Sequence, residues 1–220
     1  MDVDDFVTAN EPAAGGAAFQ LEHSKLLDVA VDGSVTAKSG SMVAYTGDLT
    51  FRGVSSAEGG LTGLIKEKAT GEGTPVMRVE GQGHLYLADD AKDVQVLSLG
   101  SGESISVNGD DVLAFADPVS YEISTIDSLA GSSSGGLTNV FLEGPGNVAI
   151  TTHGDPLVLR PPVRTDPDAT VAWSGVSPGS RVDTGLSEII GSSSGEAYQL
   201  EFEGDDGFVV VQPFEERTGT

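Results

Sequence analysis

Three histidines are the side chains of this sequence best suited to acid–base or metal chemistry. They are His23, His84 and His153, and none belongs to an H-x-H, H-E-x-x-H or H-x-x-E-H arrangement. A cupin-like metalloenzyme, the obvious enzyme on a β-barrel, needs clustered histidines with a glutamate on neighbouring strands. We therefore predict surface or turn positions for the three histidines, and we assign no catalytic residue, no metal ligand and no cofactor site.

Paired carboxylates and glycine-rich turns are the next candidates. The chain has 34 acidic residues, so adjacent pairs are background, and Asp110-Asp111 and Asp205-Asp206 are the turns that could weakly hold a hard cation. Gly81-x-Gly83 and Gly144-x-Gly146 look like part of a phosphate loop, but a β run rather than a helix N-terminus follows each. We interpret these glycines as structural residues with positive φ in hairpin turns.

Three aromatic residues each close a triplet of one aliphatic residue, one alanine and one aromatic residue. The triplets are Val43-Ala44-Tyr45, Leu113-Ala114-Phe115 and Val171-Ala172-Trp173. A ligand cage is one interpretation of such a trio. Because each aromatic residue ends a strand beside alanine, we predict instead that Tyr45, Phe115 and Trp173 form a pseudo-threefold layer of the core.

Repetition along the chain indicates how these residues are positioned. A Glu-Gly pair stands between an alternating strand and a β run within residues 78–87, 141–150 and 201–210, with steps of 63 and 60 residues (80 to 143, 143 to 203). Gly-Ser-Ser-Ser-Gly occurs at 131–135 and 191–195, after helix-compatible stretches at 126–130 and 186–190, and residues 61–71 take the equivalent place in the first copy. The period fits no solenoid of 20–45 residues and favours three units that close on one another.

The predicted fold class is mainly β: a single compact β-sandwich or barrel-like body built from about three internal β repeats with short helical turns. The three copies span residues 17–70, 71–135 and 136–195. A hairpin at 196–213 fills the gap left at the N-terminus and covers the sheet edges. Residues 1–16 form a loose acidic tail, and 214–220 form a second tail.

Local alternation predicts three strands with the most detail. Residues 25–31 form a strand that ends in a turn at Asp32-Gly33, and residues 93–99 form a strand that turns at 100–102. Residues 208–211 form another β run, which Pro213 ends.

Composition excludes several function classes. The formal net charge is −23 and there is no cysteine, which argues against nucleic-acid backbones, anionic lipid surfaces, disulfides and thiol chemistry. The N-terminus lacks a basic and then apolar signal, and no apolar run approaches the roughly 20 residues that span a bilayer, so we expect a cytoplasmic protein.

The kind of acidity indicates the solvent. Counting residues gives 19 Asp and 15 Glu against 5 Lys, and dense carboxylates keep a folded protein hydrated where about 1 M salt shortens the Debye length to near 3 Å. We predict a salt-adapted, haloarchaeal-type protein; an ordinary acidic protein is the alternative. The scarce arginines Arg78, Arg160, Arg164 and Arg181 are expected to pair with carboxylates.

Four stretches of the chain resemble one known family, mitochondrial biogenesis proteins of the altered inheritance of mitochondria protein twenty-four type. They are residues 35–45, with a Gly followed by a small-Met-aliphatic strand; 63–72, a basic stretch before Thr-Gly-Glu; 81–87, a glycine-rich β segment; and 202–213, a closing hairpin. The resemblance covers about residues 18–213. Pro161-Pro162 and Asp166-Pro167-Asp168 break the strand pattern in the second half.

That resemblance implies a fold like the tryptophan RNA-binding attenuation protein, built from repeated β units and often assembled as a homotrimer. It carries over no catalytic residue, and in mitochondria the family is tied to inner-membrane organisation. We therefore predict a non-enzymatic oligomeric scaffold or interaction protein with a protein partner that the sequence does not identify. A small-ligand or carbohydrate-binding β module is the alternative, and a cupin-like metalloenzyme comes third.

Overall fold

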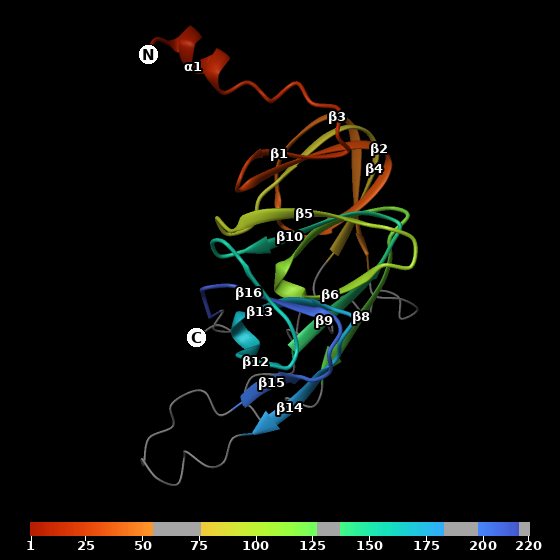
Figure 1. The fold of residues 1–220 in the computed structure, drawn as a ribbon. Helices are drawn as coiled ribbons and strands as arrows, with labels where there is room; N and C mark the ends of the chain where they lie inside the picture. Colours follow the sequence, from red (N-terminus) through yellow and green to blue (C-terminus); the bar gives the residue numbers. More distant parts are fainter. Residues whose placement is uncertain (55–75, 127–136, 183–197, 216–220) are drawn as a thin grey trace.

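The computed structural model describes residues 1–54, 76–126, 137–182 and 198–215. Strands dominate these residues, in three antiparallel sheets (Figure 1). The predicted helical stretches and both Gly-Ser-Ser-Ser-Gly loops lie outside the described residues, apart from Ile126, which ends a strand. The predicted mainly β class, with several antiparallel sheets in one body, is confirmed.

The strands fall into three successive units that we name by their order. The first unit has three long strands: β2 (Leu26–Lys38), β3 (Met42–Val54) and β4 (Val76–Leu87). The second unit has six short ones: β5 (Asp93–Leu99), β6 (Ser104–Asn108), β7 (Val112–Ala116), β8 (Ser120–Ile126), β9 (Leu137–Glu143) and β10 (Gly146–Thr152). The third also has six: β11 (Leu157–Leu159), β12 (Val163–Thr165), β13 (Thr170–Ser174), β14 (Pro178–Val182), β15 (Tyr198–Phe202) and β16 (Phe208–Val211).

Short elements connect or precede these units. An N-terminal helix, α1 (Val3–Ala9), begins at a capping box between Asp2 and Asp5 and buries none of its residues. Strand β1 (Phe19–His23) pairs with β2. Single 3₁₀ turns, η1 (Gly109–Asp111) and η3 (Pro167–Ala169), precede β7 and β13, and Asn108 and Asp166 cap them. Residues 3–9 of the predicted loose tail are therefore helical.

The pairing within the three units follows one scheme. In the first unit β4 lies between β2 and β3. In the second, the same scheme occurs twice, with β10 between β5 and β7 and with β9 between β6 and β8. In the third it occurs twice again, with β16 between β11 and β13 and with β15 between β12 and β14. The long strands of the first unit thus match pairs of short strands in the other two.

The three triplets occupy one register position in this scheme. The aromatic residues lie opposite the aliphatic residues that follow each Glu-Gly segment, as Tyr45–Leu85, Phe115–Val148 and Trp173–Val209. The preceding alanines lie opposite Tyr86, Ala149 and Val210. The aliphatic residue that opens each triplet falls in a register shift in every case, namely at Val43, Leu113 and Val171.

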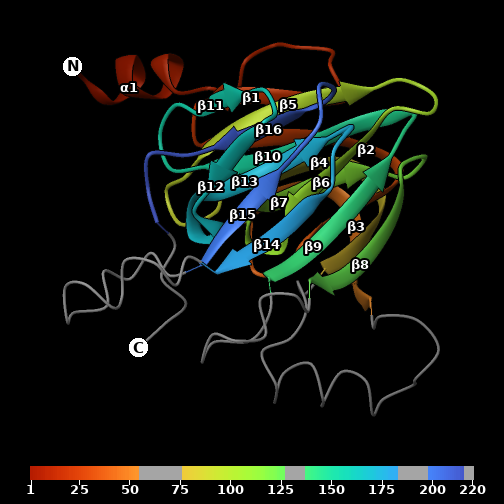
Figure 2. The ribbon, with the colours of Figure 1, turned by 60° about the horizontal axis from the view of Figure 1, so that its bottom comes forward.

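Successive units are joined by one repeated contact between strands. Strand β2 pairs with β7, with Thr36 opposite Phe115, and β6 pairs with β13, with Ser106 opposite Trp173. These junctions extend the sheet of one unit into the next, so the units follow one another along the molecule from β2–β4 at one end to β12, β14 and β15 at the other (Figures 1 and 2). The predicted closure of three units on one another is not what the pairing shows.

The cores follow the same succession. Leu27, Leu85 and Leu87 of the first unit pack with Ala114 and Ala149 of the second in one buried cluster. A second cluster combines the second unit's core with residues of the third, and a third cluster surrounds Trp173 and Phe202. Each leucine removed from water contributes roughly 1.5–3 kcal/mol, so the junctions are hydrophobic as well as hydrogen-bonded.

The glycines of β4 are required by the close approach of β3. A Cβ at Gly83 would lie 2.0 Å from the Thr46 carbonyl oxygen, and one at Gly81 would lie 2.0 Å from that of Asp48; φ is +159° and +135°. Strand β4 runs through both glycines, so the predicted hairpin turn at 81–83 is wrong although the positive φ is confirmed. The predicted hairpin turn at 144–146 is also wrong, because β9 and β10 follow one another there but belong to different sheets; the positive φ is confirmed for Gly146 alone.

Local predictions also succeeded and failed in detail. Strands β5 and β16 have the predicted bounds, 93–99 and 208–211. Strand β2 continues through the predicted turn at Asp32-Gly33, where Gly33 has φ +113°. The predicted closing hairpin at 196–213 is also wrong: in the described part of the chain β15 and β16 pair with β11–β14, not with β1 or β2.

Candidate functional site

One segment of the first unit is exposed where its counterparts are buried. We call residues 42–46 of β3 the open strand. Its Val43 is 58% exposed and its Tyr45 48%, whereas Leu113 and Phe115 are 0% and 2% exposed and Val171 and Trp173 are 0% and 3%. Ala44 is also exposed, while its counterparts Ala114 and Ala172 are fully buried. The predicted core position is confirmed for Phe115 and Trp173 and wrong for Tyr45, and the two buried rings belong to different core clusters, not to one layer.

The difference comes from the number of neighbouring strands. Strands β7 and β13 each have two partners, one in their own unit and one in the unit before. Among the described strands, β3 pairs with β4 alone. An edge of this kind presents backbone N–H and C=O groups that can pair with another strand.

A polar cluster lies next to the open strand on β2 and β4, made of Asp28, His84 and Tyr86. His84 Nδ1 is 3.0 Å from both carboxylate oxygens of Asp28, whose side chain is 8% exposed, and the His84 and Tyr86 rings stack 6.4 Å apart. Burial raises the pKa of Tyr86, and the negative charges of Asp28 and Glu22 raise it further.

Asp28 was missed by the sequence analysis. In the pairing scheme its place opposite Tyr86 corresponds to Val96 opposite Ala149 and Val158 opposite Val210. A carboxylate therefore stands in the first unit where the other two units have valine. The available signal was an aspartate flanked on both sides by apolar residues in the strand predicted at 25–31. Chemically, Asp28 fixes the orientation of the His84 ring.

The other two histidines lie in different surroundings. The backbone N–H of Lys25 donates to His23 Nδ1 at 3.2 Å. The His153 ring packs on Phe214 with centroids 4.2 Å apart, and its backbone N–H donates to Gln212. Within the described ranges, no group of three or more His, Asp or Glu side chains could hold a metal ion.

The predicted cation turn at Asp110-Asp111 is occupied by lysines. Lys92 Nζ is 2.9 Å from Asp111 Oδ1, with side chains 5% and 0% exposed. Lys38 Nζ is 2.8 Å from Asp89 Oδ2 and donates to the Asp110 carbonyl oxygen. We call these five residues the lysine junction, because they connect the first unit to the second. Asp205-Asp206 lies at an exposed turn between β15 and β16.

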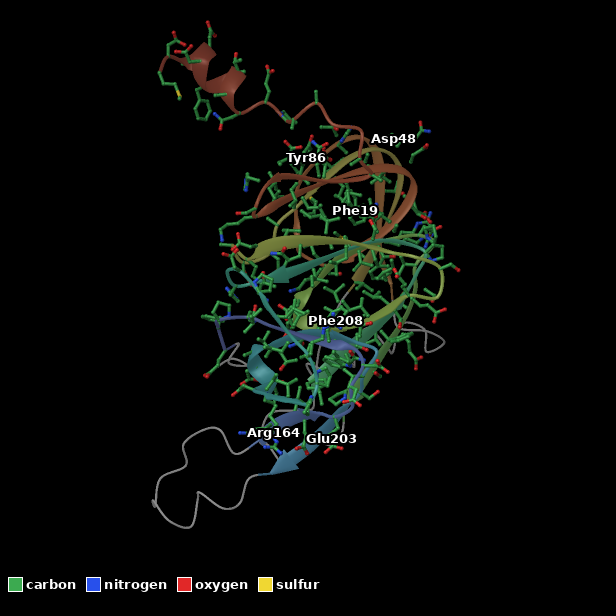
Figure 3. All side chains as sticks on the ribbon, in the orientation of Figure 1. Phe19, Asp48, Tyr86, Arg164, Glu203 and Phe208 are labelled. Atoms are coloured by element: carbon green, nitrogen blue, oxygen red, sulfur yellow. The ribbon has the colours of Figure 1, made fainter. Side chains whose placement is uncertain are left out.

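The far end of the molecule carries two arginines among several carboxylates. Arg164 of β12 lies 2.6 Å from Glu201, its side chain is 52% exposed, and Arg160 donates to the Gly207 carbonyl oxygen. Figure 3 shows Tyr86 and Arg164 toward opposite ends of the body formed by the strands. Like β3, β12 has a single partner among the described strands, β15.

The predicted pairing of arginines with carboxylates is confirmed for Arg78 and Arg164. Arg78 contacts Glu80 at 3.1 Å and Asp117 at 2.7 Å, and these carboxylates raise its pKa, the Glu80 hydrogen bond being the largest cause. Arg164 pairs with Glu201, while Arg160 donates a hydrogen bond to the Gly207 carbonyl oxygen. The Arg181 side chain lies outside the described residues.

The comparisons with known proteins agree with this fold. The profile of a family described as mitochondrial biogenesis AIM24 matches residues 19–214. A crystal structure of a Streptococcus pyogenes protein is similar to this chain with a TM-score of 0.70 and 22% identity, covering 90% of this chain and 92% of the other. No curated protein sequence matches the chain. In the part of the chain that is described, no helix has the length and hydrophobicity to cross a membrane.

Proposed function

The chain belongs to the mitochondrial biogenesis AIM24 family, and from this premise we propose that it acts as a non-enzymatic oligomeric scaffold or interaction protein. The observation that carries the proposal is the exposure of the open strand, whose two counterparts are covered by a neighbouring unit. An exposed apolar sheet edge is a surface for association with another chain.

Three tandem repeats underlie this scaffold. The shared pairing scheme, the shared register of the triplets and the shared register shift support an internal repeat over about residues 26–87, 93–152 and 157–211. In this division each repeat begins with its first strand and ends after its Glu-Gly segment, so all three are complete. The division differs from the phase predicted from the sequence, and it removes the need for a closing hairpin.

The proposed scaffold works in concentrated salt, in the cytoplasm of a salt-adapted cell. Support comes from the net charge of −23 and from the lysines, since Lys38 and Lys92 are used in the junction rather than on the surface. The urea midpoint is expected to rise between 0.1 M and about 2 M KCl as carboxylate repulsion is screened. An unchanged midpoint would refute salt adaptation.

The oligomeric state tests the proposal directly. Light scattering of the full chain in about 2 M KCl, where charge repulsion is screened, is expected to give the mass of three chains. A mass of one chain, 22.5 kDa, at all accessible concentrations would overturn the scaffold function. Any other multiple would keep the scaffold and replace the homotrimer. Elemental analysis of the same sample tests the absence of a metal.

A small-ligand or carbohydrate-binding module is the second candidate, and the polar cluster favours it. Carbohydrate sites combine an aromatic face with a few fixed hydrogen-bonding groups, and Tyr86, Asp28 and His84 supply both. Thermal shift of the wild type against the Tyr86→Ala variant with a panel of mono- and disaccharides tests it. A sugar that stabilises both equally would not bind at this cluster.

A further inference from the structure

The geometry points to a specific contact between two copies of this chain: β12 of one copy adds to the open strand of the next as an antiparallel strand. This inference rests on the proposed oligomeric function and names the surfaces that perform it. Its basis is the junction that already occurs twice within the chain, between β2 and β7 and between β6 and β13.

Each junction pairs two strands from successive units. One is the strand that comes just before the turn leading into the triplet of its unit, and the other is the strand that carries the triplet of the next unit. The first and second units donate β2 and β6 in this way, and β12 is the third unit's equivalent strand. The second and third units accept with β7 and β13, and the open strand is the first unit's equivalent. Among the described strands, β12 and the open strand are therefore the two that lack this contact, one of each kind.

The register of the new contact follows from the two existing ones. Thr36 lies opposite Phe115 and Ser106 opposite Trp173. Ser106 pairs with Phe141, which stands two residues before the glutamate of its Glu-Gly pair. Arg164 pairs with Glu201, which stands two residues before Glu203 in the same way. Arg164 is therefore the residue of β12 that corresponds to Ser106. Arg164 of one copy is thus placed opposite Tyr45 of the next, and Thr165 opposite Ala44.

The exposure of the two strands and the side chains that would face each other agree with this pairing. Arg164 would bring a guanidinium onto the Tyr45 ring, a favourable cation–π geometry. The first unit's end carries exposed Asp32 and Asp48, while the end with β12 carries Arg164 together with Glu201 and the exposed Glu203, so the cation that Arg164 supplies at Tyr45 is local and not part of a basic surface. The two surfaces lie at opposite ends of the molecule (Figure 3), so one chain cannot join its own ends and the contact is head-to-tail.

Disulfide trapping tests the register, because the chain has no native cysteine. In the Tyr45→Cys/Arg164→Cys double variant, oxidation in about 2 M KCl is expected to give a covalent series of dimers and larger species, since paired strand residues lie within disulfide range. The Thr46→Cys/Arg164→Cys control moves the thiol to the other face and is expected to cross-link at least about tenfold less. Both substituted sites are exposed, so folding is checked by circular dichroism.

Several outcomes would overturn the contact. Cross-linking of Tyr45→Cys alone would show a two-fold pairing of open strands, and equal cross-linking of the control would show unspecific collision. If light scattering shows that the Tyr45→Cys/Arg164→Cys variant is oligomeric but oxidation does not cross-link it, this interface is rejected and the scaffold function is kept. A monomeric wild type would reject both.

A blocking variant provides an independent readout. Ala44→Lys places a charge at the centre of the open strand and is expected to reduce the mass in light scattering to that of one chain. The matched control is Thr50→Lys, at an exposed position on the same face of β3 but in the half that corresponds to β8, an edge strand within the second unit. The contact would be contradicted if both variants kept the mass of the wild type, and equally if both fell to the mass of one chain.

Discussion

The first unit and the second unit share one scheme of strand pairing, but among the described strands only in the second is the strand that carries the triplet covered by a strand of another unit. In the second unit the triplet strand lies between β10 and β2, and all three of its triplet residues are buried. In the first, β4 is the one described strand beside the equivalent residues of β3, and these residues are exposed. Burial of an aliphatic-Ala-aromatic triplet is therefore conferred by the adjacent unit, not by the triplet itself.

Truncating the triplet aromatic residue of the first and of the second unit should give the largest difference in the free energy of unfolding. Phe115→Ala removes a side chain that is 2% exposed and is expected to lower the free energy of unfolding by about 3–5 kcal/mol. Tyr45→Ala loses an edge-on contact with Phe51, at 5.1 Å between centroids, and should cost about 1 kcal/mol. Urea denaturation at one low protein concentration measures both, and equal costs would contradict the comparison.

The second largest difference is expected between the junction and the open end. Lys92→Met leaves the Asp111 carboxylate buried without its ammonium partner and should cost about 3–5 kcal/mol. Arg164→Met breaks an ion pair that is half exposed and should cost at most about 1 kcal/mol.

The double variant Lys92→Met/Asp111→Leu is the control for the junction. It removes both charges and should recover most of the loss seen in Lys92→Met. A Lys92→Met variant as stable as Arg164→Met would show that the lysine junction does not stabilise the contact between units.

The long strands of the first unit give the third comparison. In Gly83→Ala the added Cβ meets the Thr46 backbone and adopts an unfavourable φ, for an expected loss of about 3 kcal/mol. Gly33→Ala has a positive φ but open space around the Cβ, so about 1–2 kcal/mol is expected. Similar urea midpoints for the two variants would mean that close approach of β3 and β4 does not require glycine.

Local features were predictable from the sequence, and features that depend on distant strands were not. The alternation at 93–99 and the apolar run at 208–211 gave β5 and β16 because side-chain periodicity is a property of the segment itself. The Gly81-x-Gly83 pattern was misread because a glycine required by close approach and a glycine in a turn look alike in sequence.

The candidate site was less predictable than the fold. Asp28 and His84 are 56 residues apart and meet only because β2 pairs with β4 in one register. The exposure of Tyr45 depends on which strand stands beside β3, and no property of the triplet contains that information. The resemblance to the family supplied the β fold without the uncovered edge.

Converting the first unit's buried carboxylate to the residue of the other units gives the smallest expected effect. Asp28→Val replaces a buried charge by the valine found at 96 and 158, so the free energy of unfolding should change by less than about 1 kcal/mol. The phenol of Tyr86 responds more clearly. A neighbouring carboxylate disfavours the phenolate, so removing Asp28 should lower the pKa of Tyr86, while burial, the larger cause, keeps it above its ordinary value of 10.0.

Ultraviolet titration at alkaline pH measures this shift, with the Tyr86→Phe variant subtracting the other three of the four tyrosines. Because the folded state favours the neutral phenol, the stability that Tyr86 contributes is present below its unfolded pKa and is lost as pH rises through the raised folded value. In Asp28→Val the loss should therefore be complete at a lower pH than in the wild type, and its total should be smaller. An unchanged titration would show that Asp28 and Tyr86 are electrostatically independent, and the polar cluster would then reduce to the Asp28–His84 pair.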